Sequence, residues 1–332
     1  MRIAIVKLSA LGDIVHSMVV LQFIKKFNKD ISIDWFVEKN YRELLELNPD
    51  INKVHLVNLK NAKKHKSLFA LFSELQKFRK LESYDVVIDM QGLIKSAIIA
   101  RLIPSESTLG FDKSSAREML ASIFYSQTFN IGYEENVIKR NFELIKFALD
   151  LPFNFSDLQN KLPFIFFSDQ CKNSNLASSK KNVVLIPGAS NSSKQYPSKK
   201  IVKLTQMLDV NFVIVWGNNT ERILAEKIFR FSPGVHISNK LSLDALASLV
   251  SCADLVIGGD TGPTHLAWAL NIPSITLFGS TPGYRNTLVT TINKFIESKS
   301  LVNPLRIDNK DHSIGDIKVK DILNLSKDLL IK

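Results

Sequence analysis

Short runs of apolar, β-branched residues alternate along the chain with segments whose apolar residues recur at helical spacing. In the first half this pattern predicts strands at Arg2–Leu8, Ile31–Val37, Val54–Val57 and Asp85–Met90, and helices at Asp13–Phe27, Tyr41–Leu47, Leu68–Leu81 and Leu93–Leu102. Strands that alternate with helices indicate a parallel sheet covered by helices on both faces.

After Asp150 the alternation loosens, and the polar stretch 161–181 is expected to be a linker region. A second series then predicts strands at Asn182–Ile186, Asn211–Trp216, Val235–Ile237, Asp254–Ile257 and Ser274–Phe278, and helices near Ser198–Leu208, Thr220–Phe231, Ser242–Ser251 and Pro263–Leu270. We therefore expect an α/β fold of two Rossmann-like, doubly wound domains, 1–160 and 182–315, that face a central cleft. Residues 316–332 predict an amphipathic C-terminal helix, with packing on the N-terminal domain as one option.

Composition narrows the class of protein. With 332 residues, 45% hydrophobic content and a net charge of +11, the chain is typical of a globular protein that attracts polyanions: nucleic acid, an anionic membrane surface or phosphorylated substrates. Lys7, Asp13 and His16 interrupt any signal-peptide core, so we expect a cytoplasmic protein that meets a membrane only peripherally. Cys171 and Cys252 have no metal-ligand spacing and are expected to be unpaired.

The loop after the first predicted strand, Ser9-Ala10-Leu11-Gly12-Asp13, is a candidate for chemistry. Gly12 permits a tight turn, and Asp13 falls at the start of a helix. Asp13 has two interpretations, a helix cap or a general base, and the helix N-terminus favours the negative charge that a base requires. Spacing alone does not choose between them.

Two loops of the second half could bind phosphate. The loop 187–197, PGASNSSKQYP, offers Ser190 and Ser192 as donors and Lys194 as a charge, although it does not match the P-loop pattern and is also typical of a plain surface loop. The loop 258–265, GGDTGPTH, is more specific. Its glycines allow close approach of a ligand, and the helix that begins at Pro263 predicts an anion site, with His265 either a further donor or structural.

Glu221 follows the strand that ends at Trp216. Its spacing from Asn218 is that of a capping box, which is one interpretation. The other is a contact to ribose hydroxyls, which acidic residues make in nucleotide-binding folds.

Taken together, the segments resemble the lipopolysaccharide heptosyltransferases, a group of GT-B glycosyltransferases. The resemblance runs nearly end to end and rests on IVKLSALGDIVHSM, VVIDMQGLIKSA, SAREMLASIFY, VWGNNTE and GGDTGPTHLAWALNIPSITLFG, in family order. The QGLIKSA and AREML stretches resemble heptosyltransferase I more than heptosyltransferase II. The chain departs from the family at Ala189-Ser190, where relatives often have threonines, which makes the assignment of Ser190 less secure.

The resemblance implies an inverting, metal-independent transfer of heptose from ADP-heptose to Kdo-lipid A, with no cofactor. It implies Asp13 as the catalytic base and Lys194 as the group that stabilises the leaving phosphate. The implied donor residues are Ser190, Ser192, Lys194, Glu221, Asp260, Thr261, Gly262 and His265. The implied acceptor residues are Ser9, Gly12, Lys60, Lys63, Lys64, Gln91, Lys95 and Arg117.

Three alternatives remain open at this point. The chain could be a heptosyltransferase II or another GT-B sugar transferase. Two Rossmann-like halves also suit a nicotinamide oxidoreductase, although no Gly-x-Gly-x-x-Gly follows the first strand of either half. The charge alone would suit a nucleic-acid-binding protein, but no DNA-recognition helix or base-stacking motif is recognisable.

The basic cluster at Lys60, Lys63 and Lys64 also has a second interpretation. Runs of charged residues of this kind usually cover a solvent-exposed face of a protein.

Overall fold

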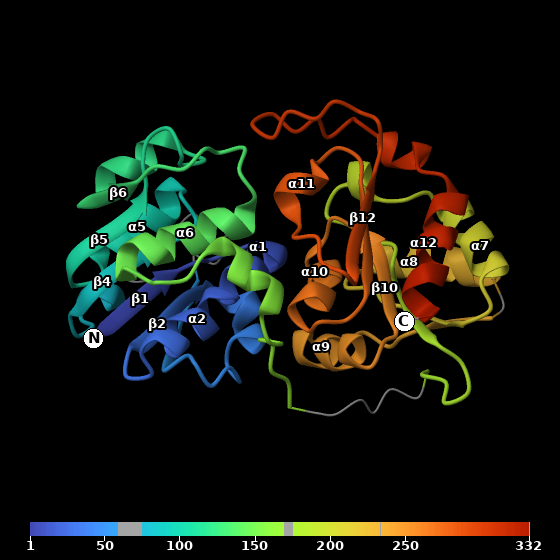
Figure 1. Ribbon diagram of the computed structural model, residues 1–332, viewed down its shortest axis with the longest axis horizontal. Helices are drawn as coiled ribbons and strands as arrows, with labels where there is room; N and C mark the ends of the chain where they lie inside the picture. Colours follow the sequence, from blue (N-terminus) through green and yellow to red (C-terminus); the bar gives the residue numbers. More distant parts are fainter. Residues whose placement is uncertain (59–74, 169–174, 233, 332) are drawn as a thin grey trace. The chain divides into compact units, whose positions relative to one another are not determined.

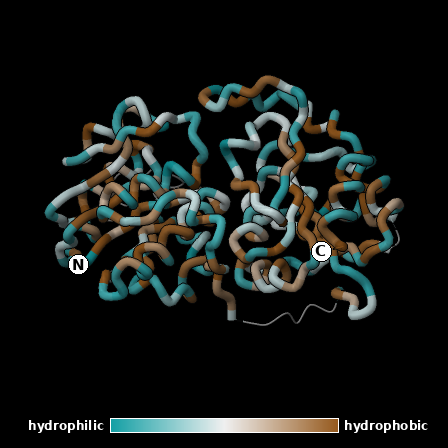
Figure 2. Tube along the Cα trace, in the orientation of Figure 1, coloured by the Kyte–Doolittle hydropathy of each residue, from teal (hydrophilic) through white to brown (hydrophobic). Residues whose placement is uncertain are grey.

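The computed structural model describes residues 1–58, 75–168, 175–232 and 234–331, and it divides into two compact units, Met1–Phe164 and Ile165–Lys332. The boundary between the units falls within the stretch expected as the linker. Figure 2 shows hydrophobic residues concentrated inside each unit and hydrophilic residues toward its outside. Each unit is described by itself.

The first unit is built on a parallel sheet with the strand order β3-β2-β1-β4-β5-β6 (Figure 1). Its strands are β1 (Arg2–Val6), β2 (Ser32–Glu38), β3 (Lys53–Val57), β4 (Tyr84–Asp89), β5 (Ser105–Phe111) and β6 (Gln127–Phe129). Its helices are α1 (Leu11–Met18), α2 (Val20–Phe27), η1 (Lys39–Leu44), α5 (Ile94–Leu102), η2 (Met119–Phe124), α6 (Val137–Leu149) and η3 (Phe155–Asn160).

The second unit repeats this plan with the order β12-β11-β10-β7-β8-β9. Its strands are β7 (Asn182–Ile186), β8 (Asn211–Ile214), β9 (Val235–Ile237), β10 (Leu255–Gly259), β11 (Ser274–Phe278) and β12 (Asn293–Glu297). Its helices are η4 (Ser192–Lys194), α7 (Ser198–Met207), α8 (Asn219–Arg230), α9 (Leu243–Ser251), α10 (Gly262–Ala269), α11 (Gly283–Asn286), η5 (Ser313–Asp316) and α12 (Val319–Ile331).

The central strands are apolar on both faces because helices cover both sides of each sheet. In β1, Ile3, Ala4, Ile5 and Val6 are all fully buried, and all five residues of β10 are buried. A strand buried on both sides needs a continuous apolar run rather than alternation, as in RIAIV. This double coverage is the α/β architecture that the sequence predicts, and the fold prediction is confirmed.

Each sheet reverses its strand order once, and this reversal places the candidate sites. In the first unit the chain moves outward from β1 to β2 and β3, then crosses to β4 on the other side of β1. In the second unit β7 and β10 are the corresponding neighbours. Loops at the carboxyl ends of two such strands diverge to opposite faces of the sheet and leave a crevice that ligands use.

Several local predictions differ from the structure. The segment Tyr41–Leu47 is replaced by the 3-10 helix η1, and Asp13–Phe27 is divided between α1 and α2 at Val19. Residues 68–74 of the predicted helix Leu68–Leu81 lie outside the described residues, and residues 75–79 are helical. The strands β5, β6 and β12 and the helix α6 were missed. In β5, SESTLGF, the polar residues at the start of the strand obscure its apolar period.

The C-terminal helix α12 packs within the second unit, where it contacts α7, β10 and β11, with Ile322 and Leu329 in the core (Figure 1). Packing on the N-terminal domain, left open by the sequence, stays a prediction. An amphipathic stripe shows that a helix needs an apolar surface but does not say which one.

The prediction of unpaired cysteines is wrong for Cys252, which is disulfide-bonded. Cys171 lies outside the described residues. Sequence spacing does not reveal which sulfur atoms come within bonding distance in the folded chain.

Candidate functional site

Two neighbouring loops of the second unit meet through a buried carboxylate at the reversal between β7 and β10. The side chain of Asp260, directly after β10, is only 9% exposed. Its Oδ2 accepts a hydrogen bond from Lys194 Nζ at 2.7 Å, and its Oδ1 lies 3.1 Å from His265 Nε2. Lys194 ends η4 in the loop after β7, so this ion pair joins the loops of two adjacent strands.

The glycines before Asp260 make this approach possible. A Cβ atom on Gly259 would lie 2.4 Å from the carbonyl oxygen of Lys194, and one on Gly258 would lie 2.4 Å from Thr264 Oγ1. Both distances are too short for a side chain, so the end of β10 must be glycine for the Lys194 loop and α10 to pack there. Thr264, buried in the first turn of α10, donates to the Gly259 carbonyl at 2.9 Å.

The environment keeps Asp260 ionised. Burial acts to raise the pKa of Asp260, but the hydrogen bond with His265 and the charge of Lys194 outweigh it and hold this pKa well below its usual range. An ionised carboxylate accepts hydrogen bonds and repels a phosphate. Asp260 is therefore suited to hold Lys194 and His265 in place, and these two are suited to face an anion.

A low pKa makes Asp260 a source of pH-dependent stability. The unfolded chain binds the proton first, so this contribution is present above the ordinary carboxyl pKa of about 4 and is lost as the pH falls toward the folded value. We expect Asp260→Asn to lower the free energy of unfolding at neutral pH by about 3 kcal/mol, the low end for a broken buried pair, since Lys194 stays partly exposed. In urea titrations the difference in the free energy of unfolding between wild type and variant should become smaller at acid pH. A difference that stays constant with pH would contradict this assignment.

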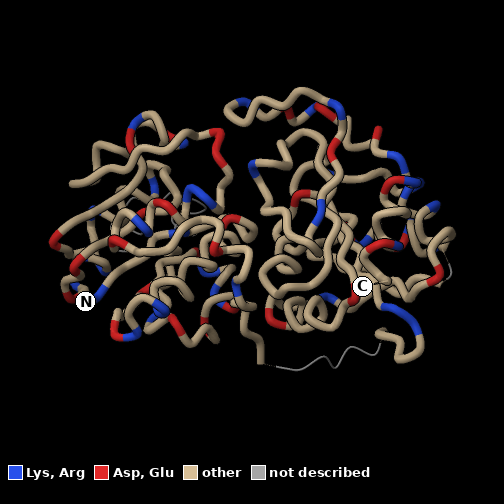
Figure 3. Tube along the Cα trace, in the orientation of Figure 1, with Lys and Arg blue, Asp and Glu red and all other residues tan. Residues whose placement is uncertain are grey.

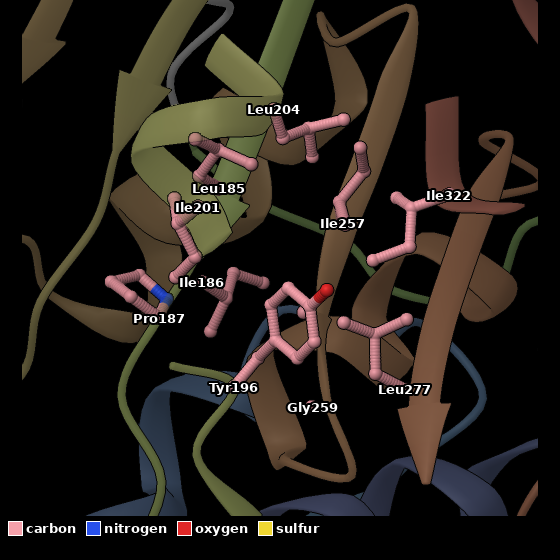
Figure 4. Close-up of a pocket in the computed structure, with 11 residues that line it drawn as sticks. Leu185, Ile186, Pro187, Tyr196, Ile201, Leu204, Ile257, Gly259, Leu277 and Ile322 are labelled. Carbon is pink, nitrogen blue, oxygen red and sulfur yellow. The ribbon is translucent and has the colours of Figure 1, made fainter. Parts of the chain in front are cut away.

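A small apolar cavity lies behind these loops, with a volume of about 20 Å³ (Figure 4). Tyr196, Ile257 and Gly259 are among its lining residues, and the Tyr196 hydroxyl donates to the Ile317 carbonyl at 2.8 Å. This volume holds one water molecule at most, so the cavity belongs to the core that supports the loops. A larger cavity of about 610 Å³ lies beside the amino ends of β8 and β9 and is lined by none of the predicted site residues.

The corresponding reversal in the first unit joins the loops after β1 and β4. Gln91 Oε1 accepts hydrogen bonds from the backbone N–H groups of Leu8 at 2.7 Å and Ser9 at 3.3 Å. Lys95 Nζ donates to Ser9 Oγ at 3.4 Å and forms an ion pair with Glu38 at 3.1 Å. Three of the predicted acceptor residues therefore come together, although Lys95 shares its charge with a carboxylate.

Asp13 lies in the first turn of α1 and is exposed. Its Oδ2 accepts a hydrogen bond from the backbone N–H of Ala10 at 3.1 Å. The N-cap residue of α1 is Ala10, so Asp13 caps the helix start from the third helical position and is not itself the N-cap. The side chain remains open to solvent on the loop that Gln91 and Lys95 fix. A carboxylate held at a helix start and left accessible can also accept a proton, so capping does not exclude the role of a base.

The pattern of this chain matches a family of known enzymes. The family model described as glycosyltransferase family 9 (heptosyltransferase) matches residues 71–300, well over half of the chain. The chain belongs to glycosyltransferase family 9. Lipopolysaccharide heptosyltransferase 1 of Campylobacter coli is 41% identical over 344 residues, which cover 99% of each protein. The enzyme of the same name from Pseudomonas aeruginosa is 29% identical and covers 86% of this chain and 80% of its own.

Solved structures agree on the fold of this family 9 chain. The structure of E. coli heptosyltransferase WaaC with ADP has a TM-score of 0.80 at 24% identity and covers 99% of this chain and 100% of its own. The structure of E. coli ADP-heptose lps heptosyltransferase II has a TM-score of 0.72 at 18% identity, with 100% and 99% coverage. The two Rossmann-like units thus form a GT-B enzyme, and the oxidoreductase and nucleic-acid alternatives fall away.

Not every predicted residue of the family 9 chain joins these networks. Lys194, Asp260 and His265 come together, whereas Ser190 and Ser192 are exposed on the loop surface. Thr261 is at the N-cap position of α10 without a side-chain capping hydrogen bond, and Gly262 begins the helix. Glu221 is engaged as a cap: its carboxylate accepts from Gly217 N at 2.7 Å and Asn218 Nδ2 at 2.9 Å, which confirms the capping interpretation and leaves the ribose contact a prediction.

The remaining acceptor predictions are scattered or undescribed. Arg117 is exposed between β5 and η2, and Gly12 is partly exposed in α1. Lys60, Lys63 and Lys64 lie outside the described residues. Figure 3 shows Lys and Arg spread among Asp and Glu over the described parts of both units, so the positive surplus is not confined to one element.

Sequence reasoning missed four polar residues of these networks. Thr281 and Ser280 follow β11, and Ser193 lies in η4; Ser280 Oγ donates to Ser193 Oγ at 3.0 Å. In the first unit, Glu38 is the last residue of β2 and forms the ion pair with Lys95. Each comes at or near the carboxyl end of a predicted strand, so the position along the strand was the signal that could have identified them.

Thr281 makes a specific prediction. It is 2% exposed, and its hydroxyl donates to Asp260 Oδ2 at 2.8 Å, the oxygen that Lys194 also contacts. We expect Thr281→Val to raise the donor KM roughly threefold to tenfold, the value of about one hydrogen bond, because Asp260 then holds Lys194 less firmly. Steady-state kinetics measure this, and Thr281→Ser should restore the wild-type KM. If the serine and valine variants behave alike, the hydroxyl does not matter.

Proposed function

We propose that this enzyme transfers heptose from ADP-heptose to a Kdo hydroxyl of Kdo-lipid A in the assembly of the lipopolysaccharide inner core. The observation that carries the proposal is the 41% identity, over the full length of both chains, to a protein named lipopolysaccharide heptosyltransferase 1. The structure of E. coli heptosyltransferase WaaC with ADP-2-deoxy-2-fluoro heptose supports the donor class, since that chain shares this fold with a TM-score of 0.78.

The proposed reaction is a single inverting displacement. The Kdo hydroxyl oxygen attacks the anomeric carbon of heptose, its proton passes to Asp13, and the bond from that carbon to the phosphate oxygen breaks. The electron pair leaves with ADP, so negative charge grows on the phosphate. Lys194 and the amide groups at the start of α10 would stabilise this charge more in the transition state than in the ground state.

This mechanism needs no metal ion, because a lysine, a histidine and a helix start supply the positive charge. Among residues 1–58, 75–168, 175–232 and 234–331, no group of three or more His, Cys, Asp and Glu side chains could hold one. If the proposed mechanism holds, activity in excess EDTA should equal activity without it. The proposal also places the enzyme on the cytoplasmic face of the inner membrane as a monomer in peripheral contact. Within the described part of the chain, no helix is long and apolar enough to span a bilayer.

The direct test is a product assay. Purified protein is incubated with ADP-heptose and either Kdo-lipid A or the same acceptor that already carries one heptose, and the products are weighed by mass spectrometry. A mass gain of one heptose on the first acceptor is expected. Transfer only to the second acceptor would indicate a heptosyltransferase II, and transfer to neither would overturn the proposed substrate.

The acceptor should respond to salt more strongly than the donor. Kdo carboxylates and lipid A phosphates are anionic, and exposed cations such as Arg117 interact with them through screened charge. The donor instead meets Lys194, which is only 23% exposed and is held by Asp260. We expect the acceptor KM to rise several-fold between 50 and 300 mM NaCl while the donor KM changes little. Equal sensitivity of the two KM values would count against cationic recognition of the acceptor.

A further inference from the structure

A buried carboxylate lies at the strand reversal of the first unit, as Asp260 does in the second. Asp89 is the last residue of β4 and is fully buried. Its strand lies between β1 and β5 (Figure 1), as β10 lies between β7 and β11. The Tyr125 hydroxyl, from the segment after β5, donates to Asp89 Oδ2 at 2.7 Å. Thr281, from the segment after β11, donates to Asp260 in the same manner, so the two units share this arrangement.

The Asp89 carboxylate fixes the turn that follows β4. Its Oδ1 accepts hydrogen bonds from the backbone N–H groups of Gln91 at 2.8 Å and Gly92 at 3.4 Å. Gly92 has a φ of +68°, in the left-handed region that favours glycine. The Lys7 ammonium, in a residue that is only 7% exposed, donates to the Met90 carbonyl of the same turn at 2.8 Å. Buried groups of the unit therefore hold this turn in one conformation.

The turn holds the loop that leads to Asp13. The Gln91 side chain accepts from the N–H groups of Leu8 and Ser9, and its Nε2 donates to Ser9 Oγ at 3.4 Å. The N–H of the next residue, Ala10, donates to Asp13 Oδ2. A continuous set of hydrogen bonds and short loop segments thus leads from the buried carboxylate to the proposed base.

Stability alone does not account for a carboxylate at this position. Burial raises the pKa of Asp89, and the hydrogen bonds from Gln91, Ser96 and Tyr125 oppose this only in part. The folded chain therefore binds the proton more tightly than the unfolded chain, and the ionised group weakens folding as the pH rises past these pKa values. A buried carboxyl of this kind beside loops that carry candidate chemistry is typical of a functional site.

We propose that Asp89 and Tyr125 are positioning residues for heptose transfer, and that they act through the Gln91 turn to hold the loop before Asp13. Neither residue contacts a substrate directly, because Asp89 is fully buried and Tyr125 is 9% exposed. The proposal rests on the proposed function, in which Asp13 takes the proton of the acceptor hydroxyl. A base that is displaced from its working position transfers the proton more slowly, whereas the donor residues of the second unit are unaffected.

Tyr125→Phe tests this role with a small change. A Cβ atom on Gly110 would lie 2.3 Å from the Tyr125 ring, so the ring packs directly on β5, and phenylalanine keeps that packing. We expect kcat to fall about tenfold, the value of a hydrogen bond to a charged group, and the Kd of ADP to stay within about twofold of wild type. Steady-state kinetics and calorimetry measure the two quantities at a temperature where both proteins are folded. An unchanged kcat would overturn the proposal.

Tyr84→Phe is the matched control. Tyr84 begins β4, at the opposite end of the strand from Asp89, and its hydroxyl donates to another buried carboxylate, that of Asp34. This variant also removes a tyrosine–aspartate hydrogen bond from the interior of the first unit, but far along the strand from the Gln91 turn. It should lower the free energy of unfolding and leave kcat at the wild-type value. Equal losses of kcat in the two tyrosine variants would show a general effect of destabilisation and would overturn the proposal.

Hydrogen exchange followed by mass spectrometry reads the loop without a substrate. The N–H groups of Leu8 and Ser9 are bonded to Gln91, so a peptide that contains them should exchange about tenfold faster in Tyr125→Phe and at the wild-type rate in Tyr84→Phe. Asp89→Asn keeps an oxygen for the N–H groups of the turn and should exchange more slowly there than Asp89→Ala. If Asp89→Ala does not fold, Tyr125→Phe decides alone. Wild-type exchange in Tyr125→Phe would show that its hydroxyl does not hold the loop.

The two measurements separate this proposal from the proposed function. If wild type transfers no heptose to Kdo-lipid A, the proposed function fails, and the exchange of the Leu8–Ser9 peptide still decides whether the pair holds the loop. If wild type transfers heptose and Tyr125→Phe exchanges faster but keeps the wild-type kcat, the pair is structural only. The positioning role then fails while the proposed function stands.

Discussion

Replacing Asp13 by asparagine is expected to reduce kcat by about 10²–10⁴-fold, the contribution of one positioned general base. Asparagine is similar in size and can still accept the hydrogen bond from the Ala10 N–H, so the turn before α1 should persist. It cannot take the proton of the attacking hydroxyl. The affinity for ADP-heptose should stay unchanged, because the residues proposed to bind the donor lie in the second unit. Pre-steady-state kinetics with saturating donor would measure the loss.

Asp157 provides a matched control for that variant. It lies at the same position of η3 as Asp13 does of α1, and its Oδ2 accepts the Asn154 N–H at 2.8 Å. Asp157→Asn removes the same charge from the same kind of helix start and should leave kcat unchanged. Near-normal turnover of Asp13→Asn, or equal losses in the two variants, would leave Asp13 as a cap alone.

The sequence was sufficient for the fold where burial is strongest. Strands such as RIAIV and LVIGG are buried on both faces, so their apolar runs stand out from the helices around them. The edge strand β6 has two exposed residues out of three, and β12 has only one buried residue, so neither carries a clear period. The helix α12 shows the other limit. Its apolar face could be predicted from the sequence. The surface that this face packs against is formed by α7, β10 and β11, which come together only in the folded chain.

The candidate site shows the same division between local pattern and long-range contact. The GGDTGPTH loop could be identified because glycine, proline and a helix start lie next to one another in sequence. The contact of Lys194 and Thr281 with the same oxygen of Asp260 could not be predicted from the sequence. The three residues span 88 positions and lie in the loops after three different strands. Glu221 was ambiguous for a different reason. Its cap hydrogen bonds are local and therefore predictable, whereas a ribose contact depends on where the ligand lies.

Replacing Lys194 by alanine is expected to weaken ADP binding about 10-fold to 100-fold, the value of a lost charge-assisted hydrogen bond of 1.5–3 kcal/mol. The reason is twofold. The ammonium group proposed to face the phosphate is lost, and the Asp260 carboxylate keeps its hydrogen-bond partners His265 and Thr281 but loses its lysine cation. A buried carboxylate without its cation repels the diphosphate. The kcat should fall as well, because the leaving phosphate gains charge in the transition state.

Lys181→Ala distinguishes this local effect from a change in net charge. Lys181 also pairs with an aspartate, Asp254, at 2.8 Å, but it precedes β7, at the opposite end of the strand from the Lys194 loop. Isothermal titration calorimetry should show wild-type ADP affinity for Lys181→Ala and partial recovery for Lys194→Arg, which keeps the charge with a different geometry. Wild-type affinity in Lys194→Ala would remove this lysine from the donor site. The Lys194–Asp260 pair would then be structural, and the anion would have to be held by the start of α10 alone.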